Sequence, residues 1–208
     1  MSSVLDGLHL ITDARGGRDA LDVVAAAVGA GARVVQVRAK DCTDLELYEF
    51  ARRVMEICSA QGTTCIVNDR VDVACAIGAQ GTHLGAEDLP VSAVRRVAGP
   101  QHVIGGTARD PEHARKLVVA GANYLGVGPA YLTTTKSGLP APLGPGGIAA
   151  VADAVAVPVI AIGGVTAERV PELLAAGARG VAVVAAVSAA KDPAAATRQL
   201  VRALDGHQ

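Results

Sequence analysis

Short strand-like stretches alternate with helix-like stretches through the whole of this 208-residue chain. The strand-like stretches are rich in Val, Ile and Leu, which is typical of strands that are buried on both faces of a parallel sheet. The stretches between them carry apolar residues three and four positions apart, as helices with one buried face do. This alternation restricts the fold to repeated strand–helix units, which either close into a barrel or open into a doubly wound sheet.

The element boundaries follow from the apolar runs and from the residues that interrupt them. The expected strands are Leu8–Thr12, Arg33–Arg38, Thr64–Asn68, Gly81–Leu84, Val103–Gly106, Tyr124–Val127, Val159–Ile162 and Gly180–Val184. The expected helices are Asp19–Gly29, Asp44–Gln61, Val71–Ile77, Val91–Ala98, Pro111–Ala120, Gly147–Ala156, Glu168–Ala176 and Pro193–Leu204.

The dipeptide Gly-Ala recurs where an expected helix ends and a strand follows, at residues 31–32, 78–79, 121–122 and 177–178. Glycine at such a joint predicts a helix C-cap in the left-handed conformation, and its recurrence indicates one repeated unit. A doubly wound dinucleotide fold would carry Gly-x-Gly-x-x-Gly after its first strand, and the residues Thr12 to Gly17 lack that pattern. We therefore predict an α/β protein in which a single (β/α)8 TIM barrel forms one domain over residues 1–208.

The composition and charge of the chain limit the classes of partner and the cellular location that we expect. Apolar residues make up 50% and aromatic residues 2%, which suits a barrel core built from Ala, Val, Leu and Ile. A net charge of −1 without a basic face argues against nucleic acid and anionic membranes as partners. No segment has the pattern of a signal peptide or a membrane span, and the four cysteines form no Cys-x-x-Cys pair. We expect a cytoplasmic protein that binds small molecules, and the sequence is compatible with a homo-oligomer.

Polar residues gather where the expected strands end, and active sites of barrels lie at that end. Alternation after the second strand places Gln36, Arg38 and Lys40 on one side, toward the barrel mouth. Amide, guanidinium and ammonium donors in one place suit phosphate oxygens. The plainer alternative is a solvated strand end.

Two aspartates follow the third and fourth strands. Asp69 and Asp88 each stand where a side chain could cap the next helix, and Asp69 taken alone favours that interpretation. On neighbouring strand ends, however, two carboxylates also suit Mg²⁺, which takes one or two of them together with substrate phosphates. His83 is expected to be a packed, hydrogen-bonded histidine rather than a catalyst.

Three further segments indicate phosphate binding. Gly105-Gly106 before Thr107 predicts either a close approach of backbone to an anion or a tight turn. The long connection from Gly128 to Gly146 carries three threonines and Lys136, which could close over phosphate as a lid, the alternative being a loop with an accidental threonine bias. The loops after strands seven and eight, with a helix N-terminus, predict a second phosphate site built from backbone N–H groups.

Seven stretches in order along the chain are similar to motifs of one enzyme family. They are Leu10-Ile11-Thr12-Asp13, Gln36-Val37-Arg38-Ala39-Lys40, the stretch from Val67 to Ala74, the stretch from Gly81 to Pro90, the stretch from Tyr124 to Pro129, Thr133-Thr134-Thr135-Lys136 and Ala161-Ile162-Gly163-Gly164-Val165. On these motifs the chain resembles the thiamine-phosphate synthases over nearly its whole length. The resemblance implies an enzyme that joins 4-amino-2-methyl-5-hydroxymethylpyrimidine diphosphate to a thiazole phosphate, forming thiamine phosphate and releasing diphosphate.

The resemblance also implies roles for residues of this chain. The pyrimidine diphosphate would be held by Gln36, Arg38, Lys40 and Asn68, and Mg²⁺ by Asp69 and Asp88. Thr107 and Lys136 would contact the diphosphate, while the thiazole phosphate would meet Thr133, Thr134, Thr135, Gly164, Val184 and Ala185.

The implied reaction requires little acid–base chemistry. Loss of diphosphate leaves a pyrimidine methylene cation, so the protein must neutralise developing negative charge and position the thiazole nitrogen. Thr107, Lys136 and Arg38, with Mg²⁺, are the groups expected to act on that charge, and a closed loop would exclude water. The attacking nitrogen carries no proton, so no side-chain base is needed.

Several positions depart from the family's usual residues. Glu is more common at Ala39, which should face away from the site, and Ser at Thr107, where the hydroxyl is retained. Ser is also usual at Ala185, so a hydroxyl for the thiazole phosphate is missing here. Leu132 replaces a common Pro in the long loop.

Three other functions stay open at this point. A thiazole tautomerase on the same barrel would lack Asp88 and would carry a His after the fifth strand, where this chain has Thr107-Ala108-Arg109-Asp110. A non-catalytic phosphate-ligand binding protein would have lost Asp69, Asp88 or Lys136. A phosphosugar isomerase would need a base at the barrel mouth, for which Asp69 is the available choice.

Overall fold

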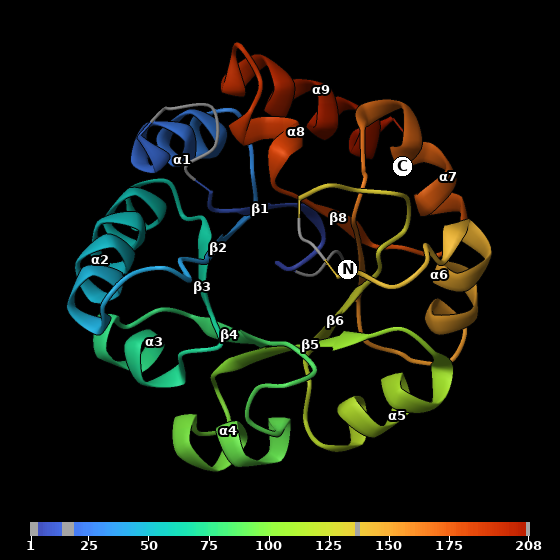
Figure 1. The fold of residues 1–208 in the computed structure, drawn as a ribbon, viewed down its shortest axis with the longest axis horizontal. Coiled ribbons are helices and arrows are strands. Elements are labelled where there is room, and N and C mark those ends of the chain that lie inside the picture. The colour runs from blue at the N-terminus through green and yellow to red at the C-terminus, as the bar shows by residue number, and fades with distance from the viewer. Residues whose placement is uncertain (1–3, 14–18, 136–137, 207–208) are drawn as a thin grey trace.

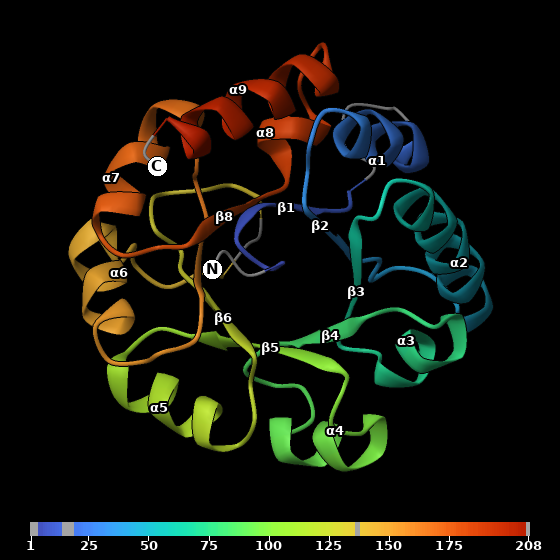
Figure 2. The same cartoon turned by 180° about the vertical axis from the view of Figure 1, so that it is seen from behind.

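Eight parallel strands close into a barrel in chain order, and helices surround it (Figures 1 and 2). The computed structural model describes residues 4–13, 19–135 and 138–206. Its strands are β1 (Gly7–Ile11), β2 (Val34–Val37), β3 (Thr64–Asn68), β4 (Gly81–Leu84), β5 (Val103–Ala108), β6 (Tyr124–Val127), β7 (Val159–Ile162) and β8 (Gly180–Val183). Its helices are α1 (Ala20–Gly29), α2 (Asp44–Ala60), α3 (Val71–Ile77), α4 (Val91–Ala98), α5 (Pro111–Val119), α6 (Gly144–Ala152), the 3-10 helix η2 (Ala167–Arg169), α7 (Val170–Ala175), α8 (Ala185–Ser188) and α9 (Pro193–Asp205).

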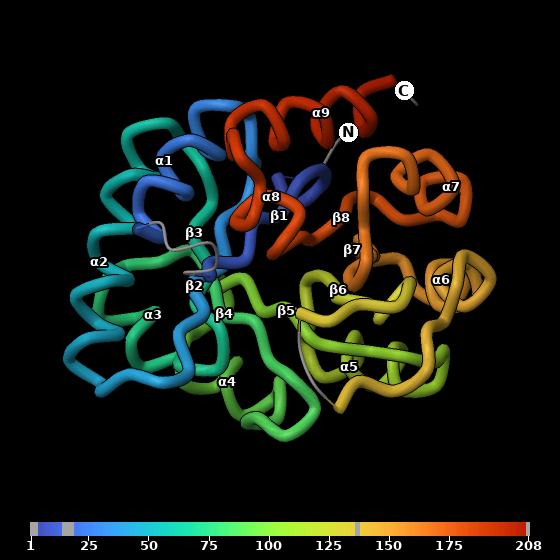
Figure 3. The backbone as a smooth tube through the Cα atoms, turned by 45° about the horizontal axis from the view of Figure 1, so that its top comes forward, coloured from blue at the N-terminus to red at the C-terminus, as the bar shows by residue number. Residues whose placement is uncertain are grey.

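Closure depends on the pairing of the first strand with the last. In β1 and β8, Leu10 lies opposite Val183 in a parallel register. The outer helices close the ring in the same way, because α9 packs against α1 (Figure 3). The predicted TIM barrel is confirmed. Within the described residues, no helix has the length and apolarity needed to cross a bilayer.

The four Gly-Ala joints adopt the predicted left-handed cap. Gly31, Gly78, Gly121 and Gly177 all have positive φ. At each joint the alanine N–H donates to the carbonyl five residues earlier, and the glycine N–H to the carbonyl three residues earlier. These paired bonds make a Schellman motif, which ends the helix and satisfies its last carbonyl groups. One local motif thus turns the chain from helix to strand at four places around the barrel.

Two apolar cores flank the strands. The larger core lies between the strands and the helices, and the smaller one fills the barrel interior. The interior core combines Ile66 and Ile160 with Tyr124, which is 1% exposed and is the largest fully buried side chain. Leu5, just before β1, belongs to the same core and closes the amino end of the barrel.

Gly105 and Gly106 lie within β5, so the expected tight turn is wrong, while the expected contact of this backbone with an anion stays a prediction. A Cβ on Gly105 would lie 2.2 Å from Cζ of Tyr124 and 2.5 Å from Nδ1 of His83. A Cβ on Gly106 would point outward, 3.1 Å from a methyl group of Leu117. Gly105 therefore makes room for two large rings inside the barrel.

Helix boundaries differ from expectation late in the chain. The helix α6 begins at Gly144 rather than Gly147, because the N–H groups of Leu143 and Gly144 donate to carbonyls of the loop after β6. The expected helix at 168–176 divides into η2 and α7. The sequence predicts a helix N-terminus after the eighth strand but gives that helix no bounds, since the four residues of α8 are too few to show helical periodicity.

Candidate active site

A hollow of about 270 Å³ opens at the carboxyl ends of β2 and β3. It brings together three residues that the sequence predicts for the site: Lys40, Asn68 and Asp69. The complete lining consists of Ala39, Lys40, Cys42, Leu47, Asn68, Asp69 and Arg70. The end of the barrel that was predicted to carry the site therefore has a hollow lined by charged side chains.

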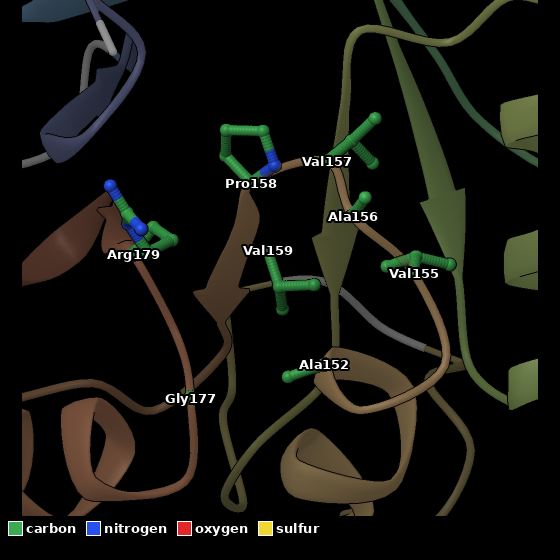
Figure 4. A pocket seen from close by; sticks show the side chains of 8 residues that line it. All are labelled: Ala152, Val155, Ala156, Val157, Pro158, Val159, Gly177 and Arg179. Carbon is green, nitrogen blue, oxygen red and sulfur yellow. The ribbon is translucent and has the colours of Figure 1, made fainter. Parts of the chain in front are cut away.

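A larger hollow, of about 410 Å³, lies at the opposite end of the barrel, before β7 and β8 (Figure 4). Its lining is mostly small apolar side chains of two loops, and its one charged residue, Arg179, pairs with Asp6 at 2.7 Å. If volume alone decided, this larger hollow would be the candidate active site. The smaller one carries amide, ammonium and carboxylate groups, so it is the candidate active site.

Asp69 has an unusual backbone. Its φ of 64° makes it the one non-glycine residue with positive φ among those the structure describes. The N–H of Arg70 donates across it to the carbonyl of Asn68 at 2.7 Å, which forms a γ-turn. The Asp69 N–H donates to the carbonyl of His83 at 2.8 Å and so ties the turn to β4. Such strained turns concentrate at functional sites, because surrounding structure must hold them.

Neither aspartate caps a helix, so the capping interpretation is wrong for both. The N-cap of α3 is Arg70 and that of α4 is Pro90, and no side chain caps either helix. The Asp88 carboxylate instead accepts the N–H of Gly85 at 2.6 Å. A Cβ on Gly85 would lie 3.0 Å from that carboxylate, so glycine leaves space for Asp88 to fold back.

The two carboxyl groups interact directly. Burial, a hydrogen bond to Asp88 and the charge of Asp88 raise the pKa of Asp69 to about 6, against the opposing effect of Lys40 and Arg38. Burial also acts to raise the pKa of Asp88, but hydrogen bonds from Asp69 and from the Gly85 N–H outweigh it and lower that pKa. Two close carboxyl groups that share a proton show pKa shifts of opposite sign. Lys40 stands beside them, with its Nζ 3.7 Å from Oδ2 of Asp69.

This pair fits a magnesium ion by the chemistry of its donors. Among the described residues no cluster of three His, Cys, Asp or Glu side chains could enclose a metal. Mg²⁺ does not require such a cage, because it binds through one or two carboxylates and takes its other ligands from water and substrate phosphates. Two interacting carboxyl groups, one of which lines the polar hollow, offer that arrangement.

Arg38 is held by a residue that the sequence did not single out. Thr12, 4% exposed at the end of β1, accepts the N–H of Arg38 at 2.8 Å and donates to its carbonyl at 3.0 Å. Since β2 ends at Val37, strand pairing cannot orient the next residue. The hydroxyl of Thr12 does so instead, and Arg38 stays half-buried near the carboxylates.

Gln36 lies deeper than expected, buried inside the barrel rather than at its mouth. It hydrogen-bonds Tyr124, a residue that sequence reasoning missed. The Tyr124 hydroxyl lies 2.9 Å from Nδ1 of His83, whose Nε2 lies 3.0 Å from the hydroxyl of Thr107. His83 is thus the packed, hydrogen-bonded histidine that was expected, and it joins two predicted site residues.

Buried histidines should make the fold sensitive to mild acid. Burial lowers the pKa of His9 and of His83 to about 4. The unfolded chain therefore takes up protons below about pH 6.5 that the folded chain refuses, and stability falls with the pH. Between pH 7 and pH 5 each histidine is expected to remove about 2 kcal/mol of the free energy of unfolding.

Urea unfolding at both pH values checks this expectation. Because Asp69, with its raised pKa, acts in the opposite sense, the comparison is between wild type and His9→Gln. Between pH 7 and pH 5, the variant should lose about 2 kcal/mol less of its free energy of unfolding than wild type does. An equal loss in both proteins would contradict it.

The long loop after β6 is anchored at its base. The N–H groups of Ala130 and Tyr131 donate to the carbonyls of Ile162 and Gly163, at 2.7 and 3.0 Å. Gly164 has a φ of 64°, and a Cβ there would lie 2.5 Å from the carbonyl oxygen of Leu132. The glycine pair after β7 therefore packs against this loop.

The remaining predicted residues lie along this loop and beyond β8. Thr133 and Thr135 are joined at 3.1 Å through their hydroxyls, while Thr134 is exposed. Lys136 lies outside the described residues. Val184 is the N-cap of α8 and Ala185 its first residue, with no side-chain cap, so the predicted helix N-terminus after β8 is present.

Arg109 braces both limbs of the loop, because its guanidinium donates to the carbonyls of Gly128 and Ala141, each at 2.9 Å. Removing it in Arg109→Ala should free the loop and raise several-fold the KM of a substrate that the loop covers, since bonds from a charged donor contribute about 1.5–3 kcal/mol. Steady-state kinetics and the rate of proteolysis within 128–144 measure the effect. Arg109→Lys, which cannot bridge two carbonyls with one planar fork, should resemble the alanine variant. Wild-type kinetics in both variants would contradict the bracing role.

Known proteins are similar to this chain over nearly its whole length. Residues 8–187 match the family model described as thiamine monophosphate synthase. The thiamine-phosphate synthase of Salinispora arenicola is 58% identical over 205 residues, covering 97% of this chain and 99% of that protein. That of Salinispora tropica is 57% identical with the same coverage. A solved structure, the thiamine phosphate pyrophosphorylase from Pyrococcus furiosus, has a TM-score of 0.89 at 32% identity and covers 97% of this chain and 96% of its own. The chain belongs to the thiamine monophosphate synthase family.

Proposed function

We propose that the carboxyl end of this barrel joins a pyrimidine diphosphate to a thiazole phosphate, releasing diphosphate, with the residue roles given below. The chain is a thiamine-phosphate synthase by family, and so a transferase of thiamine biosynthesis. The observation that carries the site assignment is the pair of carboxyls on neighbouring strand ends, Asp69 and Asp88, beside Lys40 and Arg38.

The diphosphate half of the site would use the charged rim of the hollow. Lys40 and Arg38 neutralise phosphate oxygens, and the Thr107 hydroxyl donates to them from β5. Lys136 would add a second ammonium from the long loop. Gln36 and Asn68 would bind the pyrimidine ring, Gln36 from inside the barrel and Asn68 from the end of β3.

Asp69 and Asp88 would hold Mg²⁺, which supplies positive charge to the diphosphate when bound. The chain's own contribution is to keep two carboxyls close at some cost in stability. The γ-turn at Asp69 and the Gly85 N–H at Asp88 hold them in place.

The thiazole half would lie under the long loop. Thr133 to Thr135 would meet the thiazole phosphate from above, with Gly164, Val184 and the first backbone N–H groups of α8 below it. These groups orient the thiazole nitrogen toward the pyrimidine methylene carbon and exclude water from the cation. The nitrogen carries no proton, so no base is assigned.

A single assay tests the proposal. The purified protein is mixed with Mg²⁺, the pyrimidine diphosphate and the thiazole phosphate, and thiamine phosphate and diphosphate are quantified. Both should form in equal amounts and only when both substrates are present. Omission of the pyrimidine substrate tests for thiazole isomerisation, the tautomerase reaction. Isomerisation without condensation would reject the synthase, and binding of either substrate without turnover would favour a phosphate-ligand binding protein.

Three expectations go with this function and can be measured separately. They are a cytoplasmic location, one domain over residues 1–208 and assembly into a homo-oligomer. All four cysteines are free thiols, which agrees with a reducing location.

A further inference from the structure

Four polar side chains form a continuous series of hydrogen bonds across the barrel interior, beneath the candidate site. Gln36 of β2 bonds the hydroxyl of Tyr124 on β6, and that hydroxyl lies 2.9 Å from Nδ1 of His83 on β4. Nε2 of His83 lies 3.0 Å from Oγ1 of Thr107 on β5. Both ends of this series, Gln36 and Thr107, are substrate-binding residues in the proposed function, whereas its two middle members have no role there.

The distances allow this series of hydrogen bonds to run in either direction. We take the direction in which the Gln36 amide donates and the Tyr124 oxygen accepts, because the Gln36 bond opposes the rise that burial causes in the pKa of Tyr124. The Tyr124 O–H then donates to Nδ1 of His83. A neutral imidazole that accepts at Nδ1 carries its proton on Nε2, which donates to Oγ1 of Thr107. The Thr107 hydroxyl is left with its proton free to donate elsewhere.

We propose that Tyr124 and His83 are positioning residues that make the Thr107 hydroxyl a hydrogen-bond donor to the substrate diphosphate. At the other end of this series of hydrogen bonds, the side-chain carbonyl oxygen of Gln36 is left free to accept a hydrogen bond from the pyrimidine. This inference rests on the proposed contact of Thr107 with the diphosphate. Its consequence is that an acceptor-rich diphosphate meets a donor that needs no reorientation on binding.

The interior is shaped around these two rings. A Cβ on Gly105 would collide with both of them, and a Cβ on Gly126 would lie 3.0 Å from Cε1 of His83. The ring centroids of His83 and Tyr124 are 5.5 Å apart. Burial keeps His83 neutral near pH 7, with a pKa of about 4, so that each ring nitrogen holds one role.

The first test is a double-mutant cycle in kcat/KM. Tyr124→Phe removes only the hydroxyl, and we expect it to raise the KM for the pyrimidine diphosphate and to lower kcat/KM about tenfold, the size of one net hydrogen bond. In a Thr107→Val background the same change should have no further effect, because the donor through which it acts is gone. Thr107→Ser keeps the hydroxyl, so in that background Tyr124→Phe should still lower kcat/KM about tenfold. Additive losses in kcat/KM would overturn the proposal.

The second test needs no substrate, so its outcome is independent of the proposed function. The ¹⁵N resonances of the His83 ring report which nitrogen carries the proton. In wild type, Nε2 should be protonated and Nδ1 bare, and in Tyr124→Phe the two forms should mix. A wild-type proton on Nδ1 would reject the proposal, even if the enzyme makes thiamine phosphate as expected.

A neighbouring pair of residues is the matched control. Thr82 precedes His83 on β4 and bonds Nε2 of His102 at 2.8 Å, and both residues are buried. Thr82→Val therefore removes one buried Thr–His bond that does not reach the site. It should lower the melting temperature and leave kcat/KM unchanged. If it lowers kcat/KM as much as Tyr124→Phe does, general loosening of the core explains the effect and the positioning role is wrong.

Discussion

Asp69→Asn and Asp88→Asn are each expected to lower kcat/KM by about 10²- to 10³-fold, the loss typical of removing one electrostatic group from a charge-neutralising site. Asparagine removes the negative charge with little change in shape. It also tolerates the left-handed backbone of Asp69, so the turn itself should survive. The loss of activity would then report on the missing charge rather than on a rearranged loop.

Asp69→Asn should also leave the metal-free protein as stable as wild type or more so. Burial and the charge of Asp88 raise the pKa of Asp69 to about 6, so the ionised pair destabilises the fold at pH 7. Neutralising one partner removes that repulsion. Melting temperatures measured with and without Mg²⁺ test this, since added Mg²⁺ should raise the melting temperature of wild type and not that of either variant.

Glu87→Gln is the matched control for these variants. Glu87 adjoins Asp88 in the same loop and is exposed. Its neutralisation should change neither kcat/KM nor the response to Mg²⁺. Full Mg²⁺-dependent turnover in both aspartate variants would show that the metal assignment is wrong, and an equal loss in Glu87→Gln would point to the net charge of the loop instead.

Gly105→Ala is expected to have the largest effect on folding. Its methyl group would lie 2.2 Å from Cζ of Tyr124, which is 1% exposed, so either the buried ring or the strands must shift. Overpacking of this kind costs about 1–3 kcal/mol and sometimes more, and we expect the upper end or beyond. For a chain of this length, that loss corresponds to a fall of roughly 6–12 °C in melting temperature.

Gly106→Ala separates the collision from the general cost of replacing glycine. Its methyl group would face outward against a flexible leucine side chain, at 3.1 Å, so a much smaller fall is expected. Thermal unfolding of both variants measures the difference. Equal destabilisation would contradict the role of Gly105 as space for Tyr124 and His83. Where Gly105→Ala remains folded, its kcat/KM should also fall, because the displaced rings no longer orient Thr107.

The barrel and the end that carries the site could be predicted from the sequence because their signals are local. Apolar periodicity separates strands from helices within a few residues. The Gly-Ala joints encode a backbone conformation that alanine would disfavour, and all four adopted it. Polar residues that follow consecutive strands meet at one end of any parallel barrel, so Lys40, Asn68 and Asp69 converge whatever the details of packing.

The roles of individual side chains were decided by the tertiary structure. Asp69 and Asp88 look like helix caps in sequence, and only their proximity across two strand ends makes them a pair. Gly105 looks like a turn residue until Tyr124, on the next strand, occupies the space beside it. Thr12 and Arg109 bind backbone groups that are distant in sequence and carry no local signal. The physical reason is that backbone conformation depends on near neighbours along the chain, whereas hydrogen bonding, burial and charge depend on neighbours in space.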